Sequence, residues 1–406
     1  MNASTDSMPA VGKLFSRRVV ITVLGLLQIL SWGSTFYLPA VLARPIAQDT
    51  GWPYAVVVAG LSVGLLMAGL VSPRTGRAIA LHGGRPVLAT GSILLALGLL
   101  IIGTAQNYIW YFAGWAVLGA GMGAGLYDAA FASLGALYGN AARGAITSVT
   151  LFGGFASTVC WPVSAYLVQH FGWRDTCFAY AGMHLIVGLP LYIAILPRRR
   201  GSDTGAAVAG NLPPAALHHE EWFLFGMLAA VLTISAAILS MMGAQLITLL
   251  QARGLDIKTA VTLGMLIGPS AVGARFVEML TGPRYHPIWT MVASVALVFV
   301  GACLFLVCSL GFAIAIILYA AGNGIGSIAK GTLPLALFGS VRYPALMGRL
   351  ALPIMIAMAL SPYLGAVAFQ HGGATWTFAL LLGLATANMV LVAILWMLSR
   401  RPCHPL

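Results

Sequence analysis

Long apolar runs separated by short polar gaps extend over almost the whole chain. A helix needs about 20 predominantly apolar residues to cross the hydrocarbon core of a bilayer. The pattern therefore predicts an all-α membrane protein with twelve transmembrane helices arranged as two pseudo-symmetric six-helix bundles. The predicted spans are roughly 17–43, 54–75, 86–105, 108–138, 143–169, 174–197, 222–250, 258–281, 287–309, 312–338, 346–370 and 374–399.

A polar stretch interrupts this pattern near the middle of the chain. It contains three consecutive arginines, two adjacent prolines and two adjacent glutamates. Such a stretch is typical of a connection between two membrane bundles. We therefore predict an N-terminal bundle at 1–197, a cytoplasmic linker at 198–221 and a C-terminal bundle at 222–406.

Short motifs recur between the two predicted bundles at a nearly constant offset. A duplicated architecture is typical of transporters in which two repeats rock around a central substrate site. The matching pairs are Gly121-Met-Gly123-Ala-Gly125 with Gly322-Asn-Gly324-Ile-Gly326, Gln169-His170 with Gln370-His371, and Pro162 with Pro362.

Composition excludes a soluble protein. Apolar residues make up 60% of the chain and charged residues only 7%, whereas a soluble domain has about 25% charged residues. The net charge of +12 would suit a nucleic-acid partner, but the basic residues are scattered over the gaps between apolar runs. We therefore predict contact with lipid and no nucleic acid.

The distribution of basic residues predicts the orientation. With the N-terminus inside, fifteen Lys and Arg residues fall in inner segments, and only Arg44, Arg174, Arg253 and Lys258 fall in outer gaps. Because Lys and Arg favour the cytoplasmic side, we expect both termini to be cytoplasmic. The compact loops and the lack of processing signals favour a bacterial inner (plasma) membrane.

Cofactor and enzyme chemistry find little support in the sequence. The five cysteines form no CxxC pair, which argues against a disulfide framework or a zinc site. The glycines at 119–125 follow no strand and precede no Lys-Ser/Thr pair, so they do not form a phosphate-binding loop. We predict no cofactor, no metal and no enzymatic activity.

With twelve spans, a charged central loop, glycine-rich fourth and tenth spans and an internal repeat, the chain resembles the major facilitator superfamily. The resemblance implies secondary transport of a small molecule by alternating access, with a cavity inside one chain that permits function as a monomer. The loop after the second span departs from the family pattern, because Ala80 occupies the usual acidic position.

A narrower resemblance is to the monocarboxylate and oxalate/formate porter branch. It rests on Phe36-Tyr37-Leu38-Pro39, Gly51-Trp52, Arg143-Gly144, Gly172-Trp173-Arg174 and Ala274-Arg275. This resemblance implies that Arg275 pairs with the substrate carboxylate. The family lysine and aspartate used for proton–lactate coupling fall on Ala40 and Ala271, so that coupling mechanism is not implied here.

Charged residues inside predicted spans are the main functional candidates, because a charge at the bilayer centre costs about 2.5–3.5 kcal/mol. We hypothesise that Arg275 binds a substrate anion through its planar guanidinium. The alternative is that Arg275 pairs with Glu278, which lies one helical turn later.

Asp128 and Lys330 lie at nearly duplicated positions in the fourth and tenth spans. We expect them to attract across the two bundles and close the cytoplasmic side, with Asp128 also able to carry a proton. Alternatively, Lys330 extends to the interface and Asp128 only holds helices together.

Uncharged side chains provide weaker candidates for substrate binding. Their alternative role is hydrogen bonding between helices. They are Gln28, Trp32, Tyr37, Tyr127, Gln245 and Asn323.

Taken with the resemblance, these residues predict a transporter for a small, monocarboxylate-like organic anion, proton-coupled or operating by exchange. The alternative is a proton-driven exporter of drugs or metabolites, with Asp128 as the proton carrier.

Overall fold

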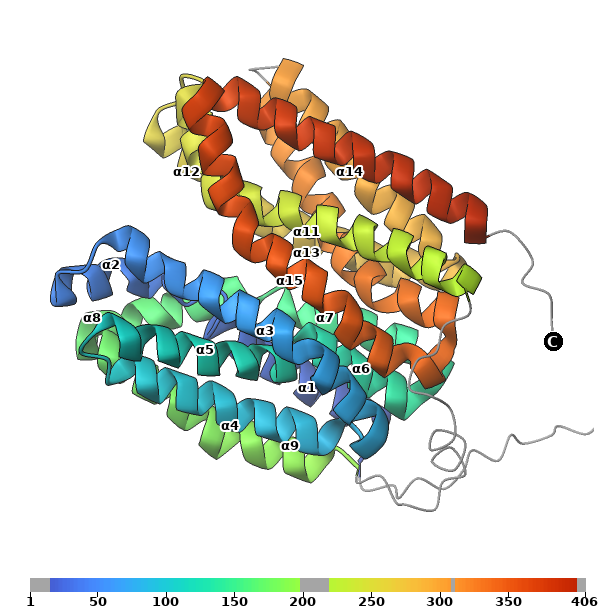
Figure 1. The fold of residues 1–406 in the computed structure, drawn as a ribbon, viewed down its shortest axis with the longest axis horizontal. Coiled ribbons are helices and arrows are strands. Elements are labelled where there is room, and N and C mark those ends of the chain that lie inside the picture. The colour runs from blue at the N-terminus through green and yellow to red at the C-terminus, as the bar shows by residue number, and fades with distance from the viewer. Residues whose placement is uncertain (1–14, 198–218, 308–310, 400–406) are drawn as a thin grey trace, which may run out of the picture.

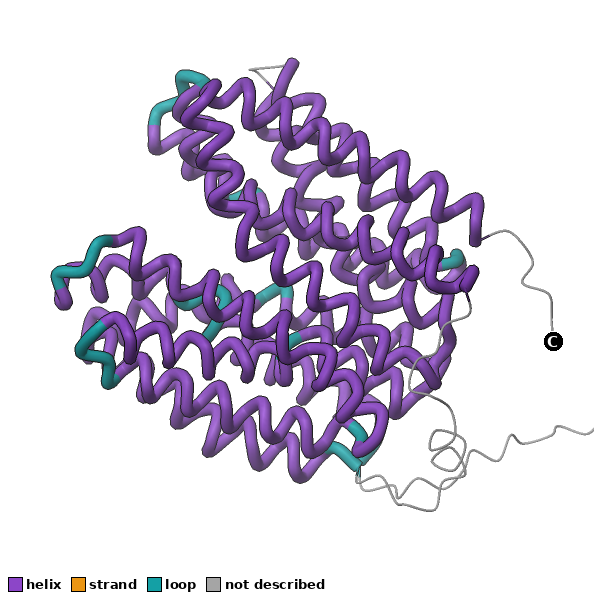
Figure 2. Tube along the Cα trace, viewed as in Figure 1, coloured by secondary structure: helices purple, strands orange, loops and turns teal. Residues whose placement is uncertain are grey.

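A computed structural model of the protein describes residues 15–197, 219–307 and 311–399. Every regular element in these ranges is a helix (Figure 2). The predicted linker at 198–221 lies almost entirely outside the described residues, as do both chain ends. We use "N-terminal half" for residues 15–197 and "C-terminal half" for residues 219–399; the division into two bundles stays a prediction.

Both halves consist of helices of very different lengths. Those of the N-terminal half are α1 (Arg17–Gly33), α2 (Pro39–Thr50), α3 (Tyr54–His82), α4 (Gly84–Gly103), α5 (Tyr108–Gly125), α6 (Tyr127–Tyr138), η1 (Gly139–Ala141), α7 (Ala142–Gly153), α8 (Ala156–Met183), the π-helix η2 (His184–Gly188) and α9 (Leu189–Ile195). Those of the C-terminal half are α11 (His219–Ala252), α12 (Ile257–Gly264), α13 (Ile267–Thr281), η3 (Gly282–Arg284), α14 (Pro287–Val307) and α15 (Phe312–Ser399).

Seven helical stretches among the described residues are long and apolar enough to cross a membrane. Two of them, Tyr108–Ile195 and Phe312–Ser399, are 88 residues long. A straight helix of that length would extend about 130 Å, whereas the hydrocarbon core is about 30 Å thick. Glycines with positive φ interrupt both, at Gly172 (φ 84) and Gly339 (φ 72), and Figure 1 shows α15 folding back on itself. The number of spans, twelve, stays a prediction.

The two halves contact each other mainly near one end of the molecule. Helices α3, α6 and α7 pack against α13 and α15. In contrast, α2 packs against α3 and α8, while α12 packs against α11 and α15. In Figure 1 the halves lie together beside α6 and diverge toward α2 and α12. We call the end with residues 139–141 and 282–284 the closed end, and the end with the turns at Gly51 and Gly254 the open end.

The duplicated glycines make equivalent contacts in the two halves. Gly121 packs against α4 and Gly123 against α3; in the same way, Gly322 packs against α14 and Gly324 against α13. At each position an added Cβ would collide with the backbone of the neighbouring helix. The absence of a side chain therefore permits these helices to approach closely, and the sequence repeat is also a repeat of helix packing.

Four predicted spans that we expected to be continuous are divided. Helices α1 and α2 divide the span at 17–43, α5 and α6 that at 108–138, α7 and α8 that at 143–169, and α12 and α13 that at 258–281. Hydropathy does not reveal these breaks, because the residues that cause them are small or apolar.

Hydroxyl groups and a proline end α1. Ser34 donates its hydroxyl to the carbonyl of Leu30 at 2.8 Å, and Thr35 does the same to Ser31 at 2.5 Å. Side-chain donors of this kind compete with the backbone N–H groups that would continue a helix. Pro39 then lacks an N–H altogether, so α2 begins there as a separate helix.

Glycine causes the next two breaks, because it is a poor helix former. Leu126 follows Gly125 and adopts an extended conformation (φ −83, ψ −169) between α5 and α6. The α7/α8 break contains Gly153 and Gly154. In the C-terminal half, Pro269 lies in the first turn of α13 and cannot donate a backbone bond across the α12/α13 break.

Candidate functional site

Arg275 lies where the two halves meet. Its Nε donates to the carbonyl of Gly324 and to the hydroxyl of Ser327, each at 3.1 Å. Ser327 itself donates to Gly324 at 2.7 Å, so the acceptors are fixed relative to each other. These bonds hold the guanidinium against α15. Its Nη1 contacts the α7/α8 break, where a Cβ added to Gly154 would collide with it.

Glu278 does not neutralise Arg275 within the described structure. Its Oε1 instead accepts a hydrogen bond of 2.7 Å from the hydroxyl of Thr290. None of the three ion pairs among the described residues includes Arg275, and its Nη groups have no hydrogen-bonding partner there. The alternative in which Arg275 and Glu278 pair is therefore not observed, and the guanidinium keeps an unmatched positive charge.

Aromatic rings face Arg275 from the N-terminal half. Trp32 lies 5.0 Å from Tyr127 and 6.3 Å from Tyr37, measured between ring centroids. The hydroxyl of Tyr127 lies against Gly153, and the Nη1 of Arg275 contacts the next residue, Gly154. Trp32 and Tyr37 belong to the α1/α2 region, and Tyr127 follows the α5/α6 break. The helix breaks thus bring three of the predicted binding residues to one place.

Asp128 and Lys330 form an ion pair between the two halves. The Nζ of Lys330 lies 2.8 Å from Oδ1 and 3.0 Å from Oδ2 of Asp128. The side chain of Lys330 is only 19% exposed and that of Asp128 only 8%. The α5/α6 break places Asp128 in the first turn of α6, where the helix dipole favours a negative charge. The ammonium is paired, in contrast to the alternative in which Lys330 extends to the interface.

Arg143 adds a second connection between the halves at the closed end. Arg143 lies at the start of α7. Its guanidinium donates to the carbonyls of Tyr285 at 2.6 Å and Gly282 at 2.5 Å. These carbonyls follow the end of α13, where a helix leaves acceptors unpaired and attracts cations. The sequence suggested only a topological and family role for Arg143, because backbone acceptors have no sequence signature.

His286 lies beside this connection, in the loop before α14. Partial burial and the nearby Arg143 lower the pKa of His286, so its imidazole is neutral at pH 7. Its Nδ1 accepts a hydrogen bond of 3.2 Å from the backbone N–H of Ile288. At this connection the cation of Arg143 therefore lies beside a neutral imidazole.

The three predicted amide residues use their donors on backbone carbonyls. Gln28 donates to Gly125 at 2.8 Å, Gln245 to Pro362 at 2.9 Å and Asn323 to Tyr319 at 3.0 Å. Gln28 satisfies the carbonyl exposed by the α5/α6 break, which is a structural role. The Oε1 atoms of Gln28 and Gln245 are buried without a partner, so both residues retain a free acceptor.

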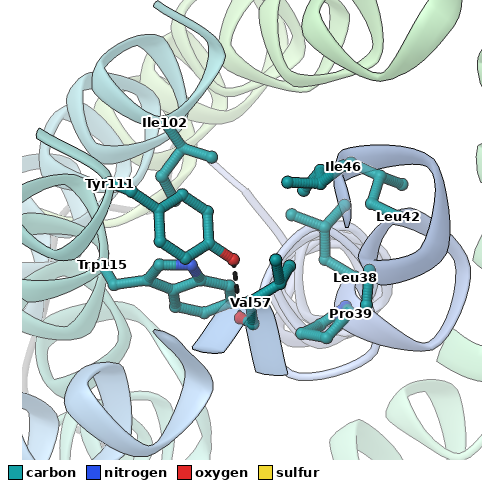
Figure 3. Close-up of a pocket in the computed structure, with 9 residues that line it drawn as sticks. Leu38, Pro39, Leu42, Ile46, Val57, Ile102, Tyr111 and Trp115 are labelled. Carbon is teal, nitrogen blue, oxygen red and sulfur yellow. Dashed lines mark hydrogen bonds between the residues drawn. The ribbon is translucent and has the colours of Figure 1, made fainter. Parts of the chain in front are cut away.

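The described cavities lie away from these residues. Figure 3 shows an apolar void of about 10 Å³ between α2, α3, α4 and α5, in which the hydroxyl of Tyr111 already donates to Val57 at 2.7 Å. This volume is at the lower limit for a single water molecule. A wider recess of about 360 Å³ at the open end is lined by Arg44, Ala47, Gln48 and Tyr54. The candidate site is therefore defined by its side-chain contacts.

Comparison with known proteins identifies the family. Residues 23–340 match the family model of the Major Facilitator Superfamily. The chain belongs to this superfamily, whose members are integral membrane transporters and not enzymes. Members of this family transport small molecules within lipid, as the sequence predicted for this chain.

Similar curated proteins are named for multidrug resistance. The chain is 27% identical over 225 residues to the multidrug resistance protein MdtL of Salmonella paratyphi B, which covers 54% of each chain. The same values hold for MdtL of Salmonella dublin. The chain thus spans about half the length of the curated relatives it matches.

Two solved structures share the fold. The human organic anion transporter MFSD10 (TETRAN) has a TM-score of 0.73 and 17% identity, covering 92% of this chain and 99% of its own. The fucose:proton symporter FucP of E. coli has a TM-score of 0.68 and 15% identity, covering 95% and 99%. At these identities the similarity establishes the fold alone.

Proposed function

We propose that the protein transports a small, monocarboxylate-like organic anion by alternating access, and that Arg275 binds the anion. The observation that carries this proposal is the unmatched guanidinium at the junction of the halves. Its Nε is fixed by Gly324 and Ser327, and its Nη groups remain free. A guanidinium oriented in this way suits bidentate binding of a carboxylate. The monocarboxylate-like pattern around Tyr37 and Arg275, and the organic anion transport named for TETRAN, agree with the proposal.

The ion pair between Asp128 and Lys330 acts in this proposal as the gate of the closed end, with Arg143 as a second contact. Under the predicted orientation the closed end is cytoplasmic, so the described conformation is outward-open. Glu278, next to Arg143, contributes to the same gate. Transport is driven by a proton gradient or by exchange. Because FucP is named as a proton symporter, coupling to protons is the first of the two to test.

Uptake into proteoliposomes tests the proposal. Radiolabelled monocarboxylates are offered with and without an inward proton gradient, to the wild type and to Arg275→Ala and Arg275→Lys. Loss of two charge-assisted hydrogen bonds, about 3 kcal/mol, should weaken apparent affinity about 100-fold in Arg275→Ala. Arg275→Lys should retain part of the affinity, because it keeps the charge but not the planar geometry. Unchanged affinity in Arg275→Ala would exclude the proposed site.

A second candidate function is proton-driven export of drugs or metabolites. The similarity to MdtL favours it, and Asp128 would then be the proton carrier. Expression in a drug-sensitive bacterial host tests this candidate: resistance that disappears in Asp128→Asn, while Arg275→Ala retains it, would support export over anion uptake.

We further propose that the protein resides in a bacterial inner membrane as a functional monomer, with 198–221 as a cytoplasmic linker between two bundles. Reporter fusions at the two termini and at the linker should all give the cytoplasmic signal. A periplasmic signal at any of these sites would contradict the orientation and reassign the closed end to the outer side.

A further inference from the structure

Five aromatic side chains form one continuous series in the N-terminal half. Neighbouring ring centroids lie 5.0 Å apart for Phe131–Tyr127 and Tyr127–Trp32, 6.3 Å for Trp32–Tyr37 and 6.0 Å for Tyr37–Trp161. The series begins fully buried at Phe131 and ends at Trp161, which is 44% exposed. The series therefore runs from a buried ring to an exposed one.

This aromatic series runs beside the unmatched charge of Arg275. The hydroxyl of Tyr127 lies against Gly153 at the α7/α8 break. The Nη1 of Arg275 contacts Gly154, which precedes Trp161 by about two helical turns on the same segment of chain. The aromatic side chains come from the N-terminal half and the cation from the C-terminal half, so a molecule that contacts both would link the halves.

A buried donor in the series also lacks a partner. The indole Nε1 of Trp32 is buried, and no acceptor lies within hydrogen-bonding distance of it in the described structure. Buried polar groups are normally hydrogen-bonded. A bound molecule with an oxygen near the aromatic rings would satisfy this donor.

We propose that the substrate is an aromatic monocarboxylate, an inference that rests on the proposed anion transport. Its carboxylate binds the Nη groups of Arg275, and its ring packs against Tyr37 and Trp161. A carboxylate oxygen or ring substituent accepts from Trp32. A short aliphatic acid would gain no ring packing, and an aromatic cation would be repelled by Arg275.

Competition for uptake tests the class of substrate. Phenylacetate, cyclohexylacetate and acetate are compared in proteoliposomes, together with phenethylamine as an aromatic cation. Packing between aromatic rings favours phenylacetate. We therefore expect the apparent affinity for cyclohexylacetate to be roughly five- to tenfold weaker than that for phenylacetate. Acetate should bind still more weakly, and phenethylamine should not compete.

Variants of the series locate the ring. Trp161→Leu should weaken the apparent affinity for phenylacetate about fivefold and leave that for acetate unchanged. Trp32→Phe keeps a ring but removes the unpaired donor, and should weaken binding of both acids. Trp376→Leu is the matched control, because Trp376 is 66% exposed outside the series and its loss should change neither value.

The possible failures are distinguishable. Equal affinity for phenylacetate and cyclohexylacetate would overturn the aromatic class of substrate. Equal losses of affinity for phenylacetate and acetate in Trp161→Leu would do the same. In either case, uptake that depends on Arg275 would still support anion transport. Absence of uptake of every anion by the folded wild type would overturn the proposed function itself. Retention of acetate uptake by Trp161→Leu shows that this variant is folded.

Discussion

Three charged side chains near the junction differ in their partners. Lys330 is matched by Asp128, Glu278 by the neutral hydroxyl of Thr290, and Arg275 by neutral acceptors alone. Removing one partner of a buried ion pair costs about 3–5 kcal/mol, because the other charge remains uncompensated. The pair should therefore control the conformation, whereas Arg275 is left to bind an anion.

Reversal of charge tests the pair. Asp128→Lys or Lys330→Asp alone puts two like charges together and should separate the closed end. The double exchange should restore closure, although incompletely, because the first turn of α6 favours a negative charge at position 128. Closure is measured by maleimide labelling of Ser340→Cys, which lies opposite Gly139 at the closed end, in a background without native cysteines.

We expect fast labelling in each single variant and slow labelling in the wild type and the double exchange. Fast labelling of the double exchange, equal to that of the single variants, would show that the ion pair does not hold the closed end.

At the scale of elements, the broken helices create the site. The α1/α2 region carries Trp32 and Tyr37, and the α5/α6 break carries Tyr127 and Asp128. Discontinuous helices near the substrate are a general feature of secondary transporters, because their ends provide unpaired backbone groups inside the membrane. Here Gln28 satisfies one such group, the carbonyl of Gly125.

Replacement of Gln28 separates its two possible roles. Gln28→Leu leaves the buried carbonyl of Gly125 without a donor, which costs about 1–3 kcal/mol and should lower the melting temperature by roughly 2–6 °C. Thermal unfolding in detergent measures this loss, with Gln48→Leu as the control because Gln48 is exposed on α2. A large loss of substrate affinity without a change in melting temperature would instead support the predicted binding role.

The sequence predicted the apolar helices, the candidate charges and the partnership of Asp128 with Lys330, because each follows from composition or from the internal offset. It did not predict the helix breaks, since hydroxyl–backbone competition at Ser34 and Thr35 leaves the hydropathy of the span almost unchanged. It also missed the partners of Arg143. Backbone carbonyls occur at every residue, so only the folded chain reveals which of them accept.

At the scale of the whole molecule, α3 and α15 form an antiparallel contact with a regular register. The hydroxyl of Ser62 donates to the carbonyl of Ala359 at 3.4 Å. Seven residues later on α3, a Cβ on Gly69 would lie 3.2 Å from the carbonyl of Leu352, seven residues earlier on α15. At the closed end Gly76 lies beside Gly348, so the two helices pack tightly there.

The same register predicts how the open end closes. One further step of seven residues toward the open end brings Ala55 on α3 opposite Ala366 on α15. Both residues are small, which permits close approach of two helices in a membrane. If the halves rock about the contact at Ser62, these alanines should meet when the closed end separates. Cysteines placed there should then form a disulfide, which requires a Cα–Cα distance of about 4.4–6.8 Å.

Oxidative cross-linking of Ala55→Cys/Ala366→Cys, in a background without native cysteines, measures this approach. The disulfide should form slowly in the otherwise wild-type chain and faster when Lys330→Asp separates the closed end. Ala55→Cys/Leu364→Cys is the matched control, because position 364 lies on the opposite face of the helix from 366. Equal rates for the two pairs, or no acceleration by Lys330→Asp, would show that the open end does not close by extending the α3–α15 register.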